Sequence, residues 1–207
     1  MTVKTAVSRF QIHDELTAPD ESAPLIKSIQ AAGGAVTKFV GVLAGAPAVL
    51  RAYTRMRSEL RGGVLPQATR ERIALAVAEH REDNYSIAQH AKSARRAGLG
   101  LDEVSKARSF TSNDPKEAAL LAYLKEALDA EGPPPLHLHE EAREIGWTDE
   151  EILEAVAHLA LNEFQSLIAS AAALPKDQAG PRVLPSAAAK AAKGRGSGHR
   201  PSTNVAV

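Results

Sequence analysis

The sequence predicts an all-α fold, and three observations support this class. Only 4% of the residues are aromatic while 44% are hydrophobic, so the core must be built from Ala, Leu, Val and Ile, whose smooth side chains suit close helix packing. Several helix starts and ends are marked by Pro, Gly and capping residues. Alternating β-branched runs and Asn-Gly or Asp-Gly hairpins do not occur. We therefore expect an oligomeric helical bundle with about seven or eight helices.

The chain divides into three segments by composition. Residues 1–24 have mixed polarity without a sustained period, which predicts an extended lead-in. Residues 25–175 carry the helical periodicity and form the expected domain. Residues 176–207 are rich in Ala, Lys, Gly, Ser and Pro and contain six basic residues against one acidic residue. Such a segment cannot bury enough apolar surface to fold, so we expect a disordered basic tail, with weak contact to an anionic partner as the alternative.

The first part of the domain is expected to be helical in pieces. A short apolar stripe over 25–29 ends at the glycine pair 33–34. Pro47 suits the first turn of a further helix, where its missing N–H does no harm. Gly62-Gly63 would end this helix by adopting positive φ angles.

The later helices are more strongly marked. Residues 69–80 contain no helix breaker and carry apolar residues on nearly all sides, which predicts a buried helix. After a polar turn, another helix is expected over 84–97, with Gly98 at its end. Asp114 precedes a proline at a helix start, and Thr148 begins a capping box.

Composition also excludes several classes of function. The 207-residue chain has no cysteine, which excludes disulfides, zinc–thiolate sites, iron–sulfur clusters and thiol-based catalysis. Its 25 basic and 25 acidic residues give zero formal charge, which argues against a nucleic-acid binder. No apolar run approaches the ~20 residues of a membrane span, and the start lacks the apolar core of a signal peptide. We expect a cytoplasmic protein without nucleic-acid or membrane partners.

Polar residues that are candidates for catalysis lie on the two helices that flank one turn. In a helix over 84–97, Ser86 and His90 are one turn apart and share a face, with Asp83 at the helix entrance. Glu71 lies in the buried helix and needs a partner to offset its desolvation. His90 on the adjacent antiparallel helix is a candidate. Because a carboxylate that orients an imidazole forms a general acid–base unit, the sequence predicts a catalytic Glu71–His90 pair.

The residues alone leave two alternatives to this pair. Glu71 can instead form a salt bridge with Arg70 or Arg72. A Ser86–His90–Glu71 hydrolase is a second alternative, although the sequence has no G-x-S-x-G elbow and a serine one turn from a histidine is poorly aligned with the ring.

The remaining histidines suggest weaker possibilities. His80 and the pair His137 and His139 lack the spacing of metal ligands, so we expect no metal site. His158 lies among Ala, Leu and Val on the last core helix and is expected to be a buried imidazole, with a place in a second wall of the active site as the alternative. Asn162 and Glu163 on the same helix are further candidates for pocket or interface residues.

These residues resemble a known family. The pattern Leu-Pro-x3-Arg-Glu ending at Glu71, an apolar helix, and then Tyr-Ser-x3-His-x3-Ala-x2-Ala-Gly-Leu around His90 is similar to the core of the carboxymuconolactone decarboxylase and alkyl hydroperoxidase D (AhpD-like) superfamily. The likeness begins near Ser-Ala-Pro before the first helix, ends after Asn-Glu-Phe in the last, and covers residues 18–175. It implies an AhpD-like helical bundle that forms a homo-oligomer with sites between subunits.

The resemblance separates two chemistries. In the alkyl hydroperoxidase branch, a Cys-x-x-Cys pair stands at the positions that are Asp83 and Ser86 here. Since neither side chain is a thiol, peroxide reduction by that mechanism is disfavoured. The decarboxylase branch implies cofactor-free acid–base chemistry on a small carboxylated lactone. In that chemistry His90 would be the acid–base and Glu71 its orienter. The substrate would contact Tyr85, Ser86 and Asp83.

We therefore expect a cysteine-free, carboxymuconolactone decarboxylase-like protein that decarboxylates or isomerises a small organic acid or lactone without cofactor or metal. The alternative is a non-catalytic family member used for binding or assembly, and a peroxidase-related protein that reduces alkyl hydroperoxides is a disfavoured third. The surroundings of His90 separate the first two hypotheses. A cavity bordered by His90, Glu71 and an arginine favours the enzyme, whereas apolar surroundings without a cavity exclude it.

Overall fold

The computed structural model describes residues 8–174, and in this range the chain forms nine helices and no strand. The helices are α1 Ala23–Ala31, α2 Lys38–Leu43, α3 Pro47–Arg61, α4 Gln67–His80, α5 Asn84–Arg96, α6 Leu101–Ala107, α7 Pro115–Asp129, α8 Leu136–Glu144 and α9 Asp149–Ala172. The predicted all-α class is confirmed. The helices outnumber the expected seven or eight because α2 has only six residues, too few to show a helical period. The predicted basic tail lies outside the described residues.

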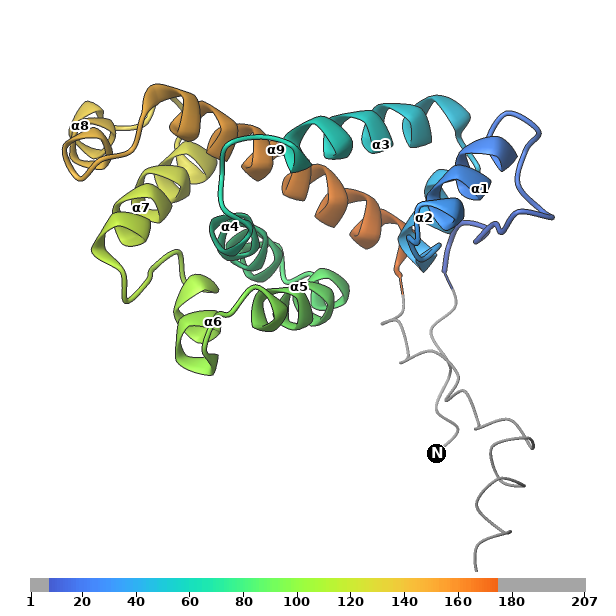
Figure 1. Cartoon of the computed structure of the whole chain (residues 1–207), viewed down its shortest axis with the longest axis horizontal. Coiled ribbons are helices and arrows are strands. Elements are labelled where there is room, and N and C mark those ends of the chain that lie inside the picture. The colour runs from blue at the N-terminus through green and yellow to red at the C-terminus, as the bar shows by residue number, and fades with distance from the viewer. Residues whose placement is uncertain (1–7, 175–207) are drawn as a thin grey trace, which may run out of the picture. The chain divides into compact units, whose positions relative to one another are not determined.

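Helix α4 is central to the packing, as its apolar sequence predicts. All residues from 72 to 78 are buried. Helix α4 packs against α5 and against the long helix α9, and α3 lies along another part of α9 (Figure 1). These four helices bring together side chains that are far apart in the sequence.

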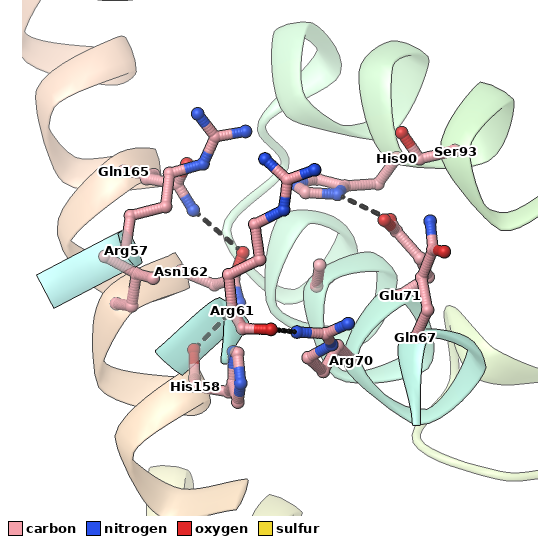
Figure 2. A pocket seen from close by; sticks show the side chains of 12 residues that line it. Arg57, Arg61, Gln67, Arg70, Glu71, His90, Ser93, His158, Asn162 and Gln165 are labelled. Atoms are coloured by element: carbon pink, nitrogen blue, oxygen red, sulfur yellow. Dashed lines mark hydrogen bonds and ion pairs between the residues drawn. The ribbon is translucent and has the colours of Figure 1, made fainter. Parts of the chain in front are cut away.

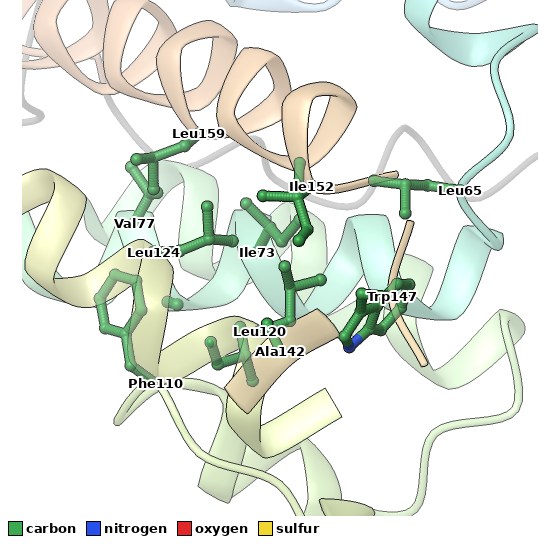
Figure 3. Close-up of a cluster of buried hydrophobic side chains, with 13 residues drawn as sticks. Leu65, Ile73, Val77, Phe110, Leu120, Leu124, Ala142, Trp147, Ile152 and Leu159 are labelled. Carbon is green, nitrogen blue, oxygen red and sulfur yellow. The ribbon is translucent and has the colours of Figure 1, made fainter. Parts of the chain in front are cut away.

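The main hydrophobic core joins α4 to α7, α8 and α9 (Figure 3). Its larger side chains are Leu65, Ile73, Val77, Phe110, Leu120, Leu124, Trp147, Ile152 and Leu159. The indole Nε1 of Trp147 donates a hydrogen bond to the Lys116 carbonyl at 2.7 Å, so burial of the ring leaves its one polar atom satisfied. This core holds α4 in place from the side opposite α5.

The marked helix boundaries are confirmed by local hydrogen bonds. Asp114 accepts from the Lys116 backbone N–H at the start of α7, and Thr148 with Glu151 forms the predicted capping box of α9. Gly98 follows α5 with φ +92°, a left-handed conformation that a residue with a Cβ rarely adopts.

The glycine pair after α3 acts differently from the prediction. Gly62 has φ −87°, and Gly63 also lacks a positive φ. A Cβ atom on Gly63 would overlap the carboxylate of Glu154 on α9. That carboxylate accepts hydrogen bonds from Val64 N at 2.7 Å and from Leu65 N at 3.0 Å. Gly63 therefore permits a close approach to α9 instead of a left-handed turn.

A buried ion network joins α4 to α6 and α7. Arg72 Nε donates to Glu103 Oε1 at 2.8 Å, and Arg72 Nη1 lies 3.3 Å from Glu117 Oε1. Glu103 also accepts from Ser112 Oγ and Asn113 N. Burial acts to raise the pKa of Glu103, but these hydrogen bonds and the Arg72 charge together lower the pKa to about 2. For Glu117 burial prevails and raises the pKa.

The depressed pKa of Glu103 makes stability depend on pH. Ionised Glu103 favours the folded state above pH 4.5, the ordinary value of this group, and that contribution is lost as the pH falls toward 2. We expect Glu103→Gln to lower the free energy of unfolding at pH 6 by about 2–3 kcal/mol. In urea unfolding, the difference in the free energy of unfolding between wild type and variant should become smaller from pH 5 to pH 3. Glu131→Gln, at an exposed position, is the control. A difference in the free energy of unfolding that stays constant with pH would contradict the account.

Candidate active site

The two residues paired by the sequence hypothesis are in contact. His90 Nδ1 on α5 lies 2.9 Å from Glu71 Oε2 on α4. A carboxylate can only accept, so Nδ1 carries the proton and Nε2 keeps a lone pair when the ring is neutral. No described residue hydrogen-bonds to Nε2. The His90 and Glu71 side chains are 23% and 15% exposed, so the pair is largely shielded from water but still reachable.

The turn between α4 and α5 sets this geometry. Asp83 Oδ1 accepts hydrogen bonds from the backbone N–H groups of Tyr85 and Ser86, each at 3.1 Å, and so caps the start of α5. Glu82 just before it has φ 51°, which lets the chain reverse within three residues. Helix α5 therefore packs back against α4. The reversal places His90 opposite Glu71.

The alternative partners of Glu71 are engaged elsewhere. Arg72 points to the buried acids of α6 and α7. Arg70 Nη1 donates to the backbone carbonyls of Arg61 at 2.8 Å and Leu60 at 3.4 Å, at the C-terminal end of α3. The carboxylate of Glu71 is thus left to the imidazole.

A cavity of about 320 Å³ opens beside the pair (Figure 2). Its walls come from α3, α4, α5 and α9, and we call it the basic cavity. The polar lining residues are Arg57, Arg61, Gln67, Arg70, Glu71, His90, Ser93, His158, Asn162 and Gln165. His90 and Glu71 are therefore bordered by a cavity and by arginines, which is the arrangement that favours the enzyme hypothesis.

Arg57 and Arg61 give the basic cavity its charge. They are one turn apart on α3, and their side chains extend toward the side of the cavity where His90 lies (Figure 2). Among the described residues, five arginines form ion pairs with carboxylates, and Arg57 and Arg61 are among the arginines that do not. Two like charges at this spacing cost a helix about 0.2–0.5 kcal/mol. An anion bound between the two guanidinium groups would remove this repulsion.

A second cavity of about 460 Å³ adjoins the basic cavity, and we call it the aromatic cavity. The two share five lining residues, Arg57, Arg61, His90, Ser93 and Gln165. The other walls come from α2, from the loop before it and from parts of α1, α3 and α5, and include Phe39, Val40, Tyr53, Tyr85 and Ser86. The shared residues place His90 at the boundary between the two spaces.

The three residues expected to contact substrate are therefore placed differently from one another. Tyr85 and Ser86 line the aromatic cavity but not the basic one. Asp83 lines neither, because it is buried at the start of α5, where one of its carboxylate oxygens caps the helix. No hydrogen bond joins Ser86 to His90 among the described residues, so the structure does not assemble the hydrolase alternative.

A hydrogen-bond chain fixes the wall between the two cavities. Tyr53 Oη donates to Gln165 Oε1 at 2.9 Å, Gln165 Nε2 donates to Asn162 Oδ1 at 2.9 Å, and Asn162 Nδ2 donates to the His158 carbonyl at 2.8 Å. Burial raises the pKa of Tyr53 against the opposing charge of Arg57, so the phenol keeps its proton and remains a donor. Gln165 is thereby held in one orientation at the boundary.

His158 turns out to be both buried and part of a cavity wall. Burial lowers its pKa, Glu154 opposes this shift and Arg70 adds to it, so the ring is neutral at pH 7. Its Nε2 has no hydrogen-bond partner among the described residues and lies 3.7 Å from Glu154 Oε1.

The sequence hypothesis does not include the two arginines of α3 or Gln165. A sequence signal for the arginines exists, because neither has an acidic residue three or four positions away.

The described part of the chain offers no metal-binding alternative to this site. No group of three or more histidines and acids suited to a metal occurs in residues 8–174. His80 and His139 instead lie 3.5 Å from Asp129 and 3.7 Å from Asp149, in pairs nearer the surface. Within the same residues, every helix is too short or too polar to cross a membrane.

The Glu71 hydrogen bond makes a prediction about the His90 ring. In 15N NMR spectra at a pH where the ring is neutral, wild-type His90 should carry its proton on Nδ1, because the carboxylate only accepts. Glu71→Ala should remove this bias. Gln67→Ala, on the same helix and in the same cavity wall, should leave the tautomer unchanged. A wild-type ring protonated on Nε2 alone would show that Glu71 does not orient it.

The sequence of the site region matches a known family. Residues 47–126 match the model of the carboxymuconolactone decarboxylase family. This range runs from the start of α3 into α7 and contains Arg57, Arg61, Glu71 and His90. No curated protein matches the chain significantly.

Solved structures share the fold. An alkylhydroperoxidase AhpD core, an uncharacterized peroxidase-related protein from Ralstonia eutropha JMP134, superposes with a TM-score of 0.72 at 21% identity, over 83% of this chain and 93% of that one. A peroxidase-related protein from Silicibacter sp. TM1040 gives 0.70 at 20% identity, over 86% and 95%. A variant of the debrominase Bmp8 in complex with 2,3,4-tribromopyrrole gives 0.64 at 17% identity, over 86% and 92%. The chain therefore shares the AhpD-like helical fold of these structures, and its residues 47–126 are similar to the carboxymuconolactone decarboxylase family.

Proposed function

We propose that this protein performs cofactor-independent acid–base chemistry, a decarboxylation or an isomerisation, on a small organic acid or lactone. One observation carries the proposal. The Glu71–His90 pair borders a cavity into which two arginines extend, and neither arginine has an acidic partner within residues 8–174. The cavity combines a proton-transfer group with a binding site for negative charge, as reactions through an enolate require.

Each residue has a distinct role in this proposal. Arg57 and Arg61 bind an oxyanion of the substrate, since a guanidinium group matches the planar geometry of a carboxylate. His90 transfers the proton through Nε2, which makes no hydrogen bond to the described protein. Glu71 is the positioning residue that holds the ring by Nδ1 and stabilises the imidazolium form.

In an isomerisation, neutral His90 acts first as a base. The Nε2 lone pair takes a proton from a carbon next to the carbonyl group, and the C–H electron pair forms an enolate. The nearby guanidinium charges stabilise the enolate oxygen. The imidazolium then returns the proton to a different carbon, so the ring ends neutral and the substrate gains and loses one proton.

In a decarboxylation, protonated His90 acts as an acid. The bond between the substrate carbon and its carboxylate breaks, CO2 leaves, and the electron pair of that bond forms the enolate. The imidazolium Nε2–H then donates its proton to carbon, and the ring later recovers a proton from water. The two reactions therefore start from different forms of the ring, which is protonated for decarboxylation and neutral for isomerisation.

A thiol peroxidase is disfavoured by the sequence itself. The chain contains no cysteine, so no side chain can form a sulfenic acid with a peroxide and be recycled through a disulfide. A non-catalytic member of the superfamily is the second candidate, and the following assay separates it from the enzyme.

Proton exchange at carbon tests the proposal across a panel of small acids and lactones. We expect wild-type protein in D2O to introduce deuterium at the enolisable carbon of at least one compound in the panel, or to release CO2 from it, as followed by NMR. His90→Gln should reduce this rate by at least about 100-fold, the usual size of a general acid–base contribution. Exposed His137→Gln is the matched control and should retain the wild-type rate. Carboxylate binding without His90-dependent exchange would favour the non-catalytic member.

A further inference from the structure

We propose that the substrate is a carboxylate with an apolar, ring-sized body, and that this body occupies the aromatic cavity while the carboxylate lies between Arg57 and Arg61. The inference rests on the proposed function and deepens it by naming the substrate class. It starts from the presence of two adjoining spaces of different chemistry, with His90 in the wall that both share.

The size of the aromatic cavity argues against a very small acid. Its volume of about 460 Å³ exceeds the 320 Å³ of the basic cavity. Pockets that enclose small organic ligands have volumes of roughly 300–1,000 Å³. A two-carbon acid held at the arginines would leave the aromatic cavity to water. A substrate that extends into the second space removes its apolar surface from water and gains affinity from that burial.

The walls of the aromatic cavity favour an apolar body. Phe39 and Tyr53 form one side, with ring centroids 5.2 Å apart in an edge-to-face arrangement, and Val40 and Tyr85 add further buried surface. The Tyr53 hydroxyl donates to Gln165, so its ring is the part left to contact a ligand.

The polar residues of the aromatic cavity do not favour binding of a substrate whose body is charged. Its lining contains no Asp or Glu that would attract a cation. Two of the lining hydroxyl groups serve the local backbone, because Thr54 Oγ1 donates to the Leu50 carbonyl at 2.8 Å and Thr37 Oγ1 accepts from Val40 N at 3.3 Å. The fixed charges in its lining are the two arginines at the boundary with the basic cavity. The polar end of the ligand therefore belongs at that boundary.

This placement also orients the substrate for the reaction. With the acid group at Arg57 and Arg61 and the body against Phe39 and Tyr53, the carbon that joins them lies at the boundary where His90 is located. The carbon next to a carboxylate or carbonyl group is the one that acid–base chemistry through an enolate deprotonates or protonates.

Ala35 offers a test that leaves the basic cavity intact. It is exposed in the loop before α2, and it lines the aromatic cavity but not the basic cavity. We expect wild-type protein to bind phenylacetate and cyclohexylacetate at least about tenfold more tightly than acetate, with a negative heat-capacity change in calorimetry. Ala35→Trp should fill part of the cavity and remove that advantage while the affinity for acetate is unchanged. Ala48→Trp, on an exposed position of α3, is the control and should change neither affinity.

The outcomes separate this inference from the proposed function. If phenylacetate binds no more tightly than acetate while both need Arg57 and Arg61, the inference is overturned and the proposed function stands. Tighter binding of the polyhydroxylated acid gluconate than of cyclohexylacetate would also overturn it, because the body would then be polar. If no acid in the set binds in a way that depends on the two arginines, both proposals fail.

Discussion

The hydrogen bond between Glu71 and His90 is the interaction on which the candidate site depends. Glu71 lies in the central helix α4, where a carboxylate without a partner would be costly to desolvate. The nearby arginines of that helix are committed to the α6–α7 network and to the end of α3, so the imidazole is the group that satisfies it. The same bond holds the ring by Nδ1 and leaves Nε2 available at the boundary of two cavities. One contact thus offsets the cost of burying Glu71 and orients the imidazole that we propose as the proton-transfer group.

Around this pair, some charged side chains are paired with opposite charges and others are not. The arginine of the buried network is fully matched by acids, whereas Arg57 and Arg61 lie one turn apart on α3 without acidic partners among the described residues. A fold selected only for stability would gain by separating or pairing these two charges. In the function that we propose, an anionic substrate in the basic cavity would supply the missing negative charge.

The sequence predicted the parts of this structure that depend on local rules. The buried helix α4, the capped starts of α7 and α9 and the facing of Glu71 and His90 follow from periodicity, capping and antiparallel packing of adjacent helices. The cavities did not follow, because their walls combine α3 and α9 with α4 and α5, and such long-range packing has no local signature. Asp83 illustrates the limit. The family resemblance predicts that Asp83 contacts the substrate. In the structure, one of its carboxylate oxygens caps the start of helix α5.

The central claim is that Arg57, Arg61 and the Glu71–His90 pair form one site for an anionic substrate. A crystal structure of the protein with phenylacetate tests it most directly. The account predicts carboxylate oxygens within hydrogen-bond distance of both guanidinium groups, the phenyl ring against Phe39 and Tyr53, and His90 Nε2 facing the carbon between them. A carboxylate bound away from the two arginines, or a His90 ring turned so that Nδ1 no longer meets Glu71, would contradict it.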